Sequence, residues 1–410
     1  MSKFNINLHE AIYSLSDALD LVGVDHVHHG KRVAFMAAEC AKALNWPDQQ
    51  IDGLFQAAIL HDCGVSNTAV HAKLAQFEWE REKEHCKLGA NILQSTPVLS
   101  HLSDIILYHH THWSDLKNLD IPEDIKLKAN CIYMVDRVDV SVLGFCLKEP
   151  NILLGKEEIR HKIAEKKNDW FSPELVDVFL EVSESDAFWL SLEREHISGY
   201  VSTWVAHDLT RKIDFKDLKS IVQIFSSIVD AKSTFTREHS DGVASLSRYL
   251  AERFNLSEEN CDIIELAGLL HDIGKLRVPD DIIEKPSKLT DSEYQIMKRH
   301  TFDTYNILKQ VKGFEQISQW AADHHERVDA SGYPNHKGKK ELSIEARIIA
   351  VADVFQALAQ RRPYREDLPP AEILSILKQQ AQTGHLDKVI VQMVETYLVE
   401  CWEKAMLQTN

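Results

Sequence analysis

Seven candidate metal ligands occur twice in this chain of 410 residues, in the same order and with similar spacing. The first set consists of His29, His61, Asp62, His85, His109, His110 and Asp136. The second set consists of His239, His271, Asp272, His300, His324, His325 and Asp353. In both sets the first two histidines are 32 positions apart, and the third and fourth are 24 apart. The repeat predicts two similar domains, which we place at 1–205 and 206–410.

Both halves carry the periodicity of amphipathic helices. Apolar side chains recur every three to four residues in segments 8–22, 32–44, 218–229 and 242–256, which predicts helices with one buried face. We find no strand-like alternation of apolar and polar residues. The fold class is therefore predicted to be all-α, with two tandem helical bundles and a helix running through the boundary near 200–216.

The composition narrows the class of protein. With 44% hydrophobic and 27% charged residues the chain is typical of a globular protein, and no apolar run approaches the roughly 18–20 residues of a membrane span. Seven scattered cysteines and the lack of a secretory signal indicate reduced thiols in the cytoplasm. A formal net charge of −17 argues against long nucleic acid, which binds basic surfaces. A small anion could still bind a local cluster of cations and metals.

The chemistry of the second set points to phosphoester hydrolysis. Imidazole and carboxylate ligands suit iron, manganese or zinc. Adjacent helical residues point about 100° apart, so His271 and Asp272 can face one centre only at a helix end, with the carboxylate bridging two ions. Two such ions can activate a water and hold a phosphate. Lys275, one turn after His271, could neutralise charge that develops on phosphate oxygens.

The second half also resembles a known family. The motifs HDIGK at 271–275, HH at 324–325 and GYP at 332–334, together with Asp353, resemble the HD-GYP branch of the HD-domain phosphohydrolases from about Phe215 onward. Members of this family are all-α bacterial phosphodiesterases with two or three iron or manganese ions. They open cyclic di-GMP, and some open cyclic GMP-AMP, to a linear dinucleotide. The resemblance implies the same cofactors and a cyclic dinucleotide substrate here.

The resemblance also implies a role for each residue of the second half. One metal would be held by His239, His271 and Asp353. The other would be held by His300, His324 and His325, with Asp272 as the bridge. As for the substrate, Lys275 would contact the scissile phosphate, Tyr333 would line the pocket, and Arg362 and Arg365 would bind the second phosphate or a guanine.

Two positions depart from the family pattern. The family's DGSGYP reads DASGYP here, so Ala330 is strained if the backbone requires a positive φ. Phe235 stands where members with three metals carry a glutamate, so we expect two ions rather than three.

The first half resembles a degenerate HD domain. Val65 replaces the lysine, the GYP motif is absent, and Phe145 and Lys148 stand in place of the two arginines. We expect a regulatory domain that either binds metal through its seven ligands or is purely structural. A second active site for another substrate is a further alternative.

Two other functions are compatible with the sequence. The protein could be a non-catalytic cyclic-dinucleotide receptor, with Ala330 marking the loss of activity, or a hydrolase of a mononucleotide. The sequence does not decide whether the substrate is cyclic di-GMP or cyclic GMP-AMP, or whether the metal is iron or manganese. It also leaves open whether the protein forms a homodimer and which signal regulates it. The arginine pair and the GYP motif favour a ligand with two phosphates, and so favour the cyclic dinucleotide.

Overall fold

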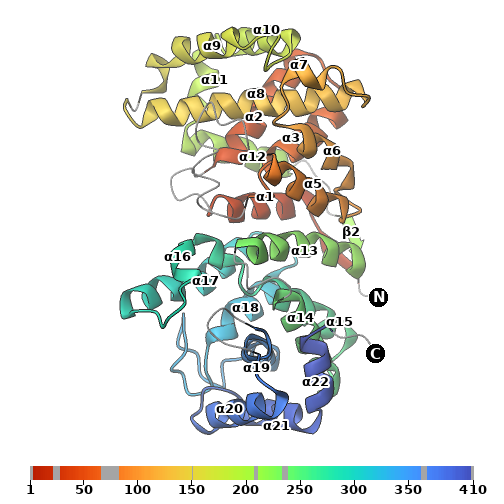
Figure 1. Cartoon of the computed structure of the whole chain (residues 1–410), viewed down its shortest axis with the longest axis vertical. Coiled ribbons are helices and arrows are strands. Elements are labelled where there is room, and N and C mark those ends of the chain that lie inside the picture. The colour runs from red at the N-terminus through yellow and green to blue at the C-terminus, as the bar shows by residue number, and fades with distance from the viewer. Residues whose placement is uncertain are drawn as a thin grey trace. The chain divides into compact units, whose positions relative to one another are not determined.

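The computed structural model describes residues 3–21, 28–65, 83–149, 151–206, 211–232, 239–361 and 367–407. The chain divides into two compact units, Asn7–Leu209 and Thr210–Asn410, and the latter also includes Met1–Ile6. We call them the N-terminal and C-terminal units. Both are built almost entirely of helices, which confirms the predicted all-α class (Figure 1). We expected one boundary, between residues 205 and 206. The structure instead places the first six residues with the C-terminal unit and the boundary between Leu209 and Thr210.

The N-terminal unit is a bundle in which α2 packs against α3 and α8, and α1 packs against α3. Its elements are α1 (Leu8–Leu19), α2 (His29–Ala43), α3 (Asp48–Leu60), α5 (Glu84–Gln94), η1 (Ser100–Leu102), α6 (Ser103–Tyr108), α7 (Trp113–Leu116), α8 (Glu123–Cys146), η2 (Ile152–Leu154), α9 (Lys156–Glu165), α10 (Pro173–Val182), α11 (Asp186–Leu190) and α12 (Arg194–Ala206).

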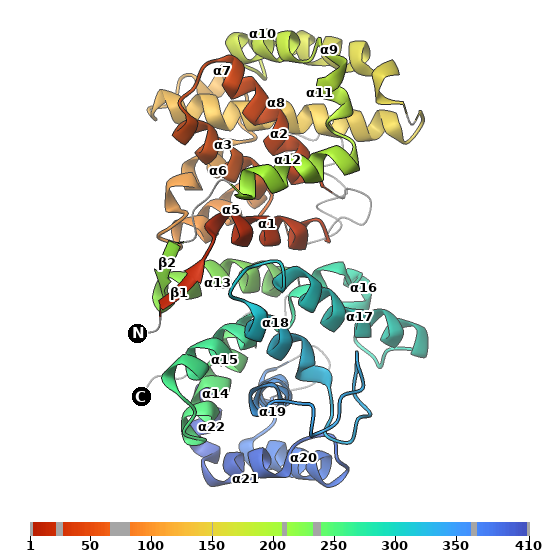
Figure 2. The ribbon, with the colours of Figure 1, turned by 180° about the vertical axis from the view of Figure 1, so that it is seen from behind.

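The C-terminal unit surrounds α19, which lies in the middle of the unit in both views (Figures 1 and 2). Its elements are β1 (Lys3–Ile6), β2 (Arg211–Asp214), α13 (Phe215–Lys232), α14 (His239–Arg253), α15 (Glu258–Leu270), η3 (Ile273–Arg277), α16 (Asp280–Ile283), α17 (Asp291–Leu308), α18 (Glu315–Ala322), η4 (Asp323–His325), α19 (Ile344–Ala359), α20 (Pro370–Gln382), α21 (Lys388–Thr396) and α22 (Leu398–Ala405).

The same packing recurs in the two units. In each unit the helix with the first histidine, α2 or α14, packs against the helix before the HD pair and against the helix with the last aspartate. Helices α2 and α14 are each followed, two residues after their last residue, by an asparagine in the left-handed conformation, Asn45 (φ 54°) and Asn255 (φ 53°), where the chain turns toward the next helix. The repeat seen in the sequence is therefore also a repeat of architecture.

The predicted helix through 200–216 is wrong. Helix α12 ends at Ala206, and Arg211–Asp214 form strand β2, which pairs antiparallel with β1 at the start of the chain (Figure 2). Four residues are too few to show an alternating pattern, and the pairing partner lies about 200 positions away, so local sequence could not indicate this ribbon.

Among the described residues, no helix combines the length and the apolar character that a membrane crossing would require.

Candidate metal centre

The seven residues of the second set converge from five separate segments of the C-terminal unit. His239 opens α14, His300 lies in α17, and Asp353 lies in α19. His271 and Asp272 sit where α15 gives way to η3, and His324 and His325 lie in η4. Both adjacent pairs are thus at helix ends or in 3₁₀ turns, where neighbouring side chains can face one centre.

Gly274 lets the HD pair approach α17. A Cβ atom at this position would lie 2.0 Å from the carbonyl oxygen of His300 and 2.9 Å from the amide nitrogen of Thr304. The glycine of the motif is therefore required because η3 lies directly against the backbone of α17, and this contact brings Asp272 to His300. Gly64 has the same environment in the N-terminal unit, 2.0 Å from the carbonyl oxygen of His85.

The two carboxylate oxygens of Asp272 face different groups of ligands. Oδ2 lies 3.2 Å from Nε2 of His271 and 3.7 Å from Nε2 of His239. Oδ1 lies 3.5 Å from Nε2 of His300 and 3.8 Å from Nε2 of His324. One side chain therefore spans two sets of ligand atoms, as a carboxylate that bridges two metal ions would.

Two further contacts complete these sets. Oδ1 of Asp353 lies 3.4 Å from Nε2 of His239, which adds a carboxylate to the first set. Nε2 of His300 and of His324 are 3.4 Å apart, and a ligand atom of His325 belongs to the same compact group. The spacing matches nitrogen and oxygen atoms that share an ion at about 2.0–2.2 Å.

Hydrogen bonds fix which ring nitrogen four of the five histidines offer. The Nδ1–H groups of His271, His300 and His324 donate to carbonyl oxygens of residues three positions earlier, at 2.7, 2.6 and 2.6 Å. His239 donates its Nδ1–H to the side-chain oxygen of Gln356. These bonds leave the Nε2 lone pairs directed into the centre, which is the usual arrangement of metal-binding histidines.

Burial and neighbouring charges act in opposite directions at this centre: burial alone would lower the pKa of His271, but the Asp272 carboxylate outweighs it and raises that pKa. Burial lowers the pKa of His300 to about 3 and that of His325 to about 4. Burial acts to raise the pKa of Asp272, but His271 and Lys275 outweigh it and hold this pKa well below its usual range. Oδ1 of Asp272 is buried without a hydrogen-bond partner. An uncompensated carboxylate oxygen among neutral imidazoles fits divalent cations.

Lys275 and Tyr333 adjoin this centre. The Lys275 ammonium pairs with Oδ2 of Asp272 at 2.5 Å, and its side chain is 23% exposed. The Tyr333 ring lies 5.0 Å from the His325 ring, centroid to centroid. Arg362, Arg365 and Phe235 lie outside the described residues.

A buried carboxylate holds the GYP loop. Glu326 is 3% exposed and accepts hydrogen bonds from the backbone amides of Asn335 and Lys337, at 2.6 and 2.9 Å. A Cβ atom on Gly332 would lie 2.5 Å from the backbone at His325 and Arg327, so the glycine permits this close return of the chain. The loop is thereby fixed to the segment that carries His324 and His325.

Ala330 has a φ of +64°, the left-handed conformation that the sequence pattern raised as a concern. Because glycine adopts this conformation without strain, we expect Ala330→Gly to raise the free energy of unfolding by about 1 kcal/mol. Ala371, exposed in the first turn of α20, provides the control, since Ala→Gly at a position with ordinary helical backbone should not raise stability. Chemical unfolding followed by circular dichroism measures both changes; a loss of stability in Ala330→Gly would contradict the strain.

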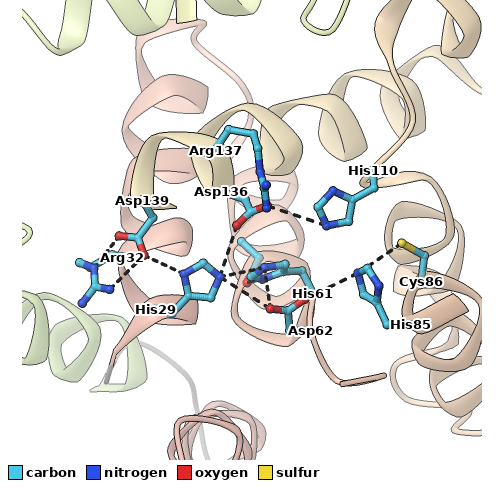
Figure 3. A network of polar contacts seen from close by, with 11 residues as sticks. His29, Arg32, His61, Asp62, His85, Cys86, His110, Asp136, Arg137 and Asp139 are labelled. Carbon is cyan, nitrogen blue, oxygen red and sulfur yellow. Dashed lines mark hydrogen bonds and ion pairs between the residues drawn. The ribbon is translucent and has the colours of Figure 1, made fainter. Parts of the chain in front are cut away.

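The seven residues of the first set are also brought together in the N-terminal unit, and Figure 3 labels all of them except His109. Nε2 of His29 lies 3.3 Å from Nε2 of His61 and 3.4 Å from Oδ1 of Asp136. Nε2 of His85 lies 3.8 Å from Oδ1 of Asp62, and the His109 and His110 rings are 4.4 Å apart.

Sequence reasoning did not identify several residues that contact the two centres. Gln356 was one of them, although its position one turn after Asp353 on a buried helix was a usable signal. Asp139 holds the corresponding position after Asp136 and accepts a hydrogen bond from His29 at 2.7 Å. Arg137, which pairs with Asp136 at 2.7 Å, follows a candidate ligand directly and gave no periodic signal.

Comparison with known proteins identifies relatives for both units. Models of the HD domain match residues 27–141 and 223–390. The chain is 35% identical to 3′3′-cGAMP-specific phosphodiesterase 1 of Vibrio cholerae, over 96% of this chain and 92% of the relative. It is 31% identical to a cyclic di-GMP phosphodiesterase of Pseudomonas aeruginosa, over 73% of this chain and 67% of the relative.

The fold has a counterpart among crystal structures. A cyclic GMP-AMP-specific phosphodiesterase of V. cholerae matches with a TM-score of 0.63 and 23% identity, over 100% of this chain and 99% of that one. The resemblance inferred from the motifs is confirmed by a phosphodiesterase that aligns with 96% of this chain at 35% identity. The protein is a member of the HD-GYP family of HD-domain phosphodiesterases, with a second HD domain in tandem.

Proposed function

We propose that the C-terminal unit hydrolyses a cyclic dinucleotide to a linear dinucleotide at a centre of two divalent ions, iron or manganese. The observation that carries this proposal is the placement of Asp272, whose two oxygens face two separate groups of ligand atoms. The first ion would be held by His239, His271 and Asp353. The second would be held by His300, His324 and His325.

The bound ions would supply Lewis acidity toward the phosphate and toward the attacking water. The reaction adds one water across one phosphodiester bond. The water oxygen bonds to phosphorus, the bond from phosphorus to one ribose oxygen breaks, and that oxygen takes up a proton. The chain's residues hold the phosphate in line and keep Asp272 ionised between the two groups.

Lys275 would bind the phosphate that reacts. Its ammonium pairs with Asp272, yet its side chain is partly exposed, so it can turn to a phosphate oxygen when substrate enters. We expect Lys275→Met to lower kcat by about 10²–10³-fold, because a fixed positive charge near the developing charge is lost. Steady-state kinetics measure this change, and metal content serves as the control, since it should stay at the wild-type level. An unchanged kcat would contradict the assigned role.

The remaining recognition would involve the second phosphate and the bases. Tyr333 lies beside His325 and would line the pocket. We propose that Arg362 and Arg365 bind the second phosphate or a guanine, because the planar guanidinium offers paired donors to such groups.

We propose 3′,3′-cyclic GMP-AMP as the preferred substrate and cyclic di-GMP as the second candidate. The reason is that a relative aligned with 96% of this chain is specific for the former, whereas the Pseudomonas relative acts on the latter. Purified protein loaded with Mn²⁺ or, anaerobically, Fe²⁺ would be incubated with cyclic GMP-AMP, cyclic di-GMP and cyclic di-AMP. Chromatography of the products reports which ring is opened.

Each alternative has its own outcome in this experiment. Faster opening of cyclic GMP-AMP supports the proposal, and faster opening of cyclic di-GMP would reverse the preference. Tight binding of a ring without any linear product, with both ions present, would indicate a receptor. Hydrolysis of mononucleotides with all three rings left intact would indicate a mononucleotidase.

A further inference from the structure

Four side chains of the first set, those of His29, His61, Asp62 and Asp136, form one compact group in the N-terminal unit. Nε2 of His29 lies 3.3 Å from Nε2 of His61, 3.4 Å from Oδ1 of Asp136 and 3.7 Å from Oδ2 of Asp62. His61 Nε2 lies 3.5 Å from the same Asp62 oxygen. Ligand atoms about 2.0–2.1 Å from a shared ion in a tetrahedral site would be about 3.3–3.4 Å apart. This position is therefore already assembled for one ion.

The carboxylate of Asp139 supports the metal ligand His29 in this candidate ion site. His29 donates Nδ1–H to Oδ2 of Asp139, and Arg32 holds Asp139 in place through Nη2 at 2.9 Å (Figure 3). The corresponding partner in the C-terminal unit is the uncharged amide of Gln356. A carboxylate behind a histidine makes the imidazole a more basic metal ligand.

The candidate position of a second ion in the N-terminal unit, beside His85 and His110, has surroundings that disfavour a cation. Oδ2 of Asp136 lies 3.8 Å from Nε2 of His110 but is bonded by the Arg137 guanidinium at 2.7 Å. The Arg137 side chain is 1% exposed, so this charge is fixed inside the cluster (Figure 3). Val354 holds the corresponding place beside Asp353. A fixed cation beside a candidate ion disfavours binding of that ion.

A thiol also engages this second position. Cys86 Sγ lies 3.5 Å from Nε2 of His85, so the thiol contacts the nitrogen that would bind the second ion. Cys86, His85 and His109 could alternatively bind an ion together, since their ligand atoms lie within 4.8 Å of one another. If Cys86 only contacts His85, the N-terminal unit binds one ion; if Cys86, His85 and His109 bind an ion together, it binds two.

The space beside the first position is small. A cavity of about 20 Å³ is lined by residues that include His29, His61, Asp62 and Val65. That volume accommodates one water-sized group. Within the described residues, it is far too small for a cyclic dinucleotide.

We infer that the N-terminal unit binds one divalent transition-metal ion, through His29, His61, Asp62 and Asp136. The buried guanidinium of Arg137 replaces the charge of a second ion. This unit is thus a mononuclear metal site without a phosphate-binding lysine, whatever reaction the C-terminal unit performs.

Metal counting tests the inference without any activity assay. The full chain would carry His271→Ala, Asp272→Ala and His324→Ala, which together remove ligands of both ion positions of the C-terminal centre. After Mn²⁺ loading and desalting, we expect one ion per chain by mass spectrometry. Electron paramagnetic resonance should show an isolated Mn²⁺ rather than a coupled pair. Adding His61→Ala should remove this ion.

Arg137 is tested in the same background. Arg137→Met removes the charge at similar side-chain length, and we expect a second ion and a coupled signal. Arg137→Lys keeps the charge and should retain one ion. Circular dichroism checks the fold of each variant. Two ions with Arg137 intact would contradict the inference and favour the Cys86 arrangement, and no ion would make the unit structural.

Discussion

Asp272→Ala should abolish hydrolysis, with kcat lowered by about 10³-fold or more, whereas Asp62→Ala should leave kcat within about twofold of wild type. The first substitution removes both oxygens that join the two ligand groups. The second changes the equivalent residue in a unit where Val65 replaces the lysine and the nearby cavity has room for only about one water-sized group. The two aspartates are the best matched pair in the chain.

The comparison needs metal content and fold measured on both variants. Asp272→Ala should lose ions from the C-terminal centre, and Asp62→Ala should keep them. An equal loss of kcat in the two variants, with each still folded, would contradict the division of roles between the units.

Gly274→Ala should cost about 3 kcal/mol of stability and also release metal. The added methyl group would lie 2.0 Å from the His300 carbonyl oxygen and 2.9 Å from the Thr304 nitrogen, and neither backbone atom can move without displacing α17. The close contact between η3 and α17 brings Asp272 to His300. If η3 moves away from α17 to relieve the clash, Asp272 moves away from His300. Chemical unfolding gives the stability and mass spectrometry gives the metal content.

Gly338→Ala is the control in the same unit. Its Cβ atom would meet its nearest neighbours at 3.7–3.9 Å, which is ordinary contact, so stability and metal content should stay close to wild type. Similar stabilities for the two variants would show that η3 does not depend on close approach to α17.

The convergence of the candidate ligands into two clusters could be predicted from the sequence. Histidine and aspartate are costly to bury without partners, so two ordered sets with shared spacing indicated two clusters before any geometry was known. The adjacent pairs required helix ends, and His271–Asp272 and His324–His325 lie at such ends. The concern over Ala330 was also justified, since its φ is positive.

Other features depend on contacts that no local pattern encodes. Strand β1 pairs with a segment about 200 positions away, and neither strand is long enough to alternate. Glu326 is polar and near a histidine pair, but its role in holding the GYP loop depends on where Asn335 and Lys337 return. Arg137 gave no signal in the sequence, and only packing reveals that its guanidinium is buried beside Asp136.

The most direct test of the account is metal titration of the stripped protein with cyclic GMP-AMP as substrate. Chelator-treated protein would receive increasing Mn²⁺, and linear dinucleotide would be measured by chromatography beside ion content, in wild type and in His61→Ala. We predict no product without metal, and a rate that rises as the C-terminal centre fills and is the same in both proteins. Full activity in stripped protein, or no linear product from cyclic GMP-AMP or cyclic di-GMP with the centre filled, would contradict the proposed metal-dependent phosphodiesterase.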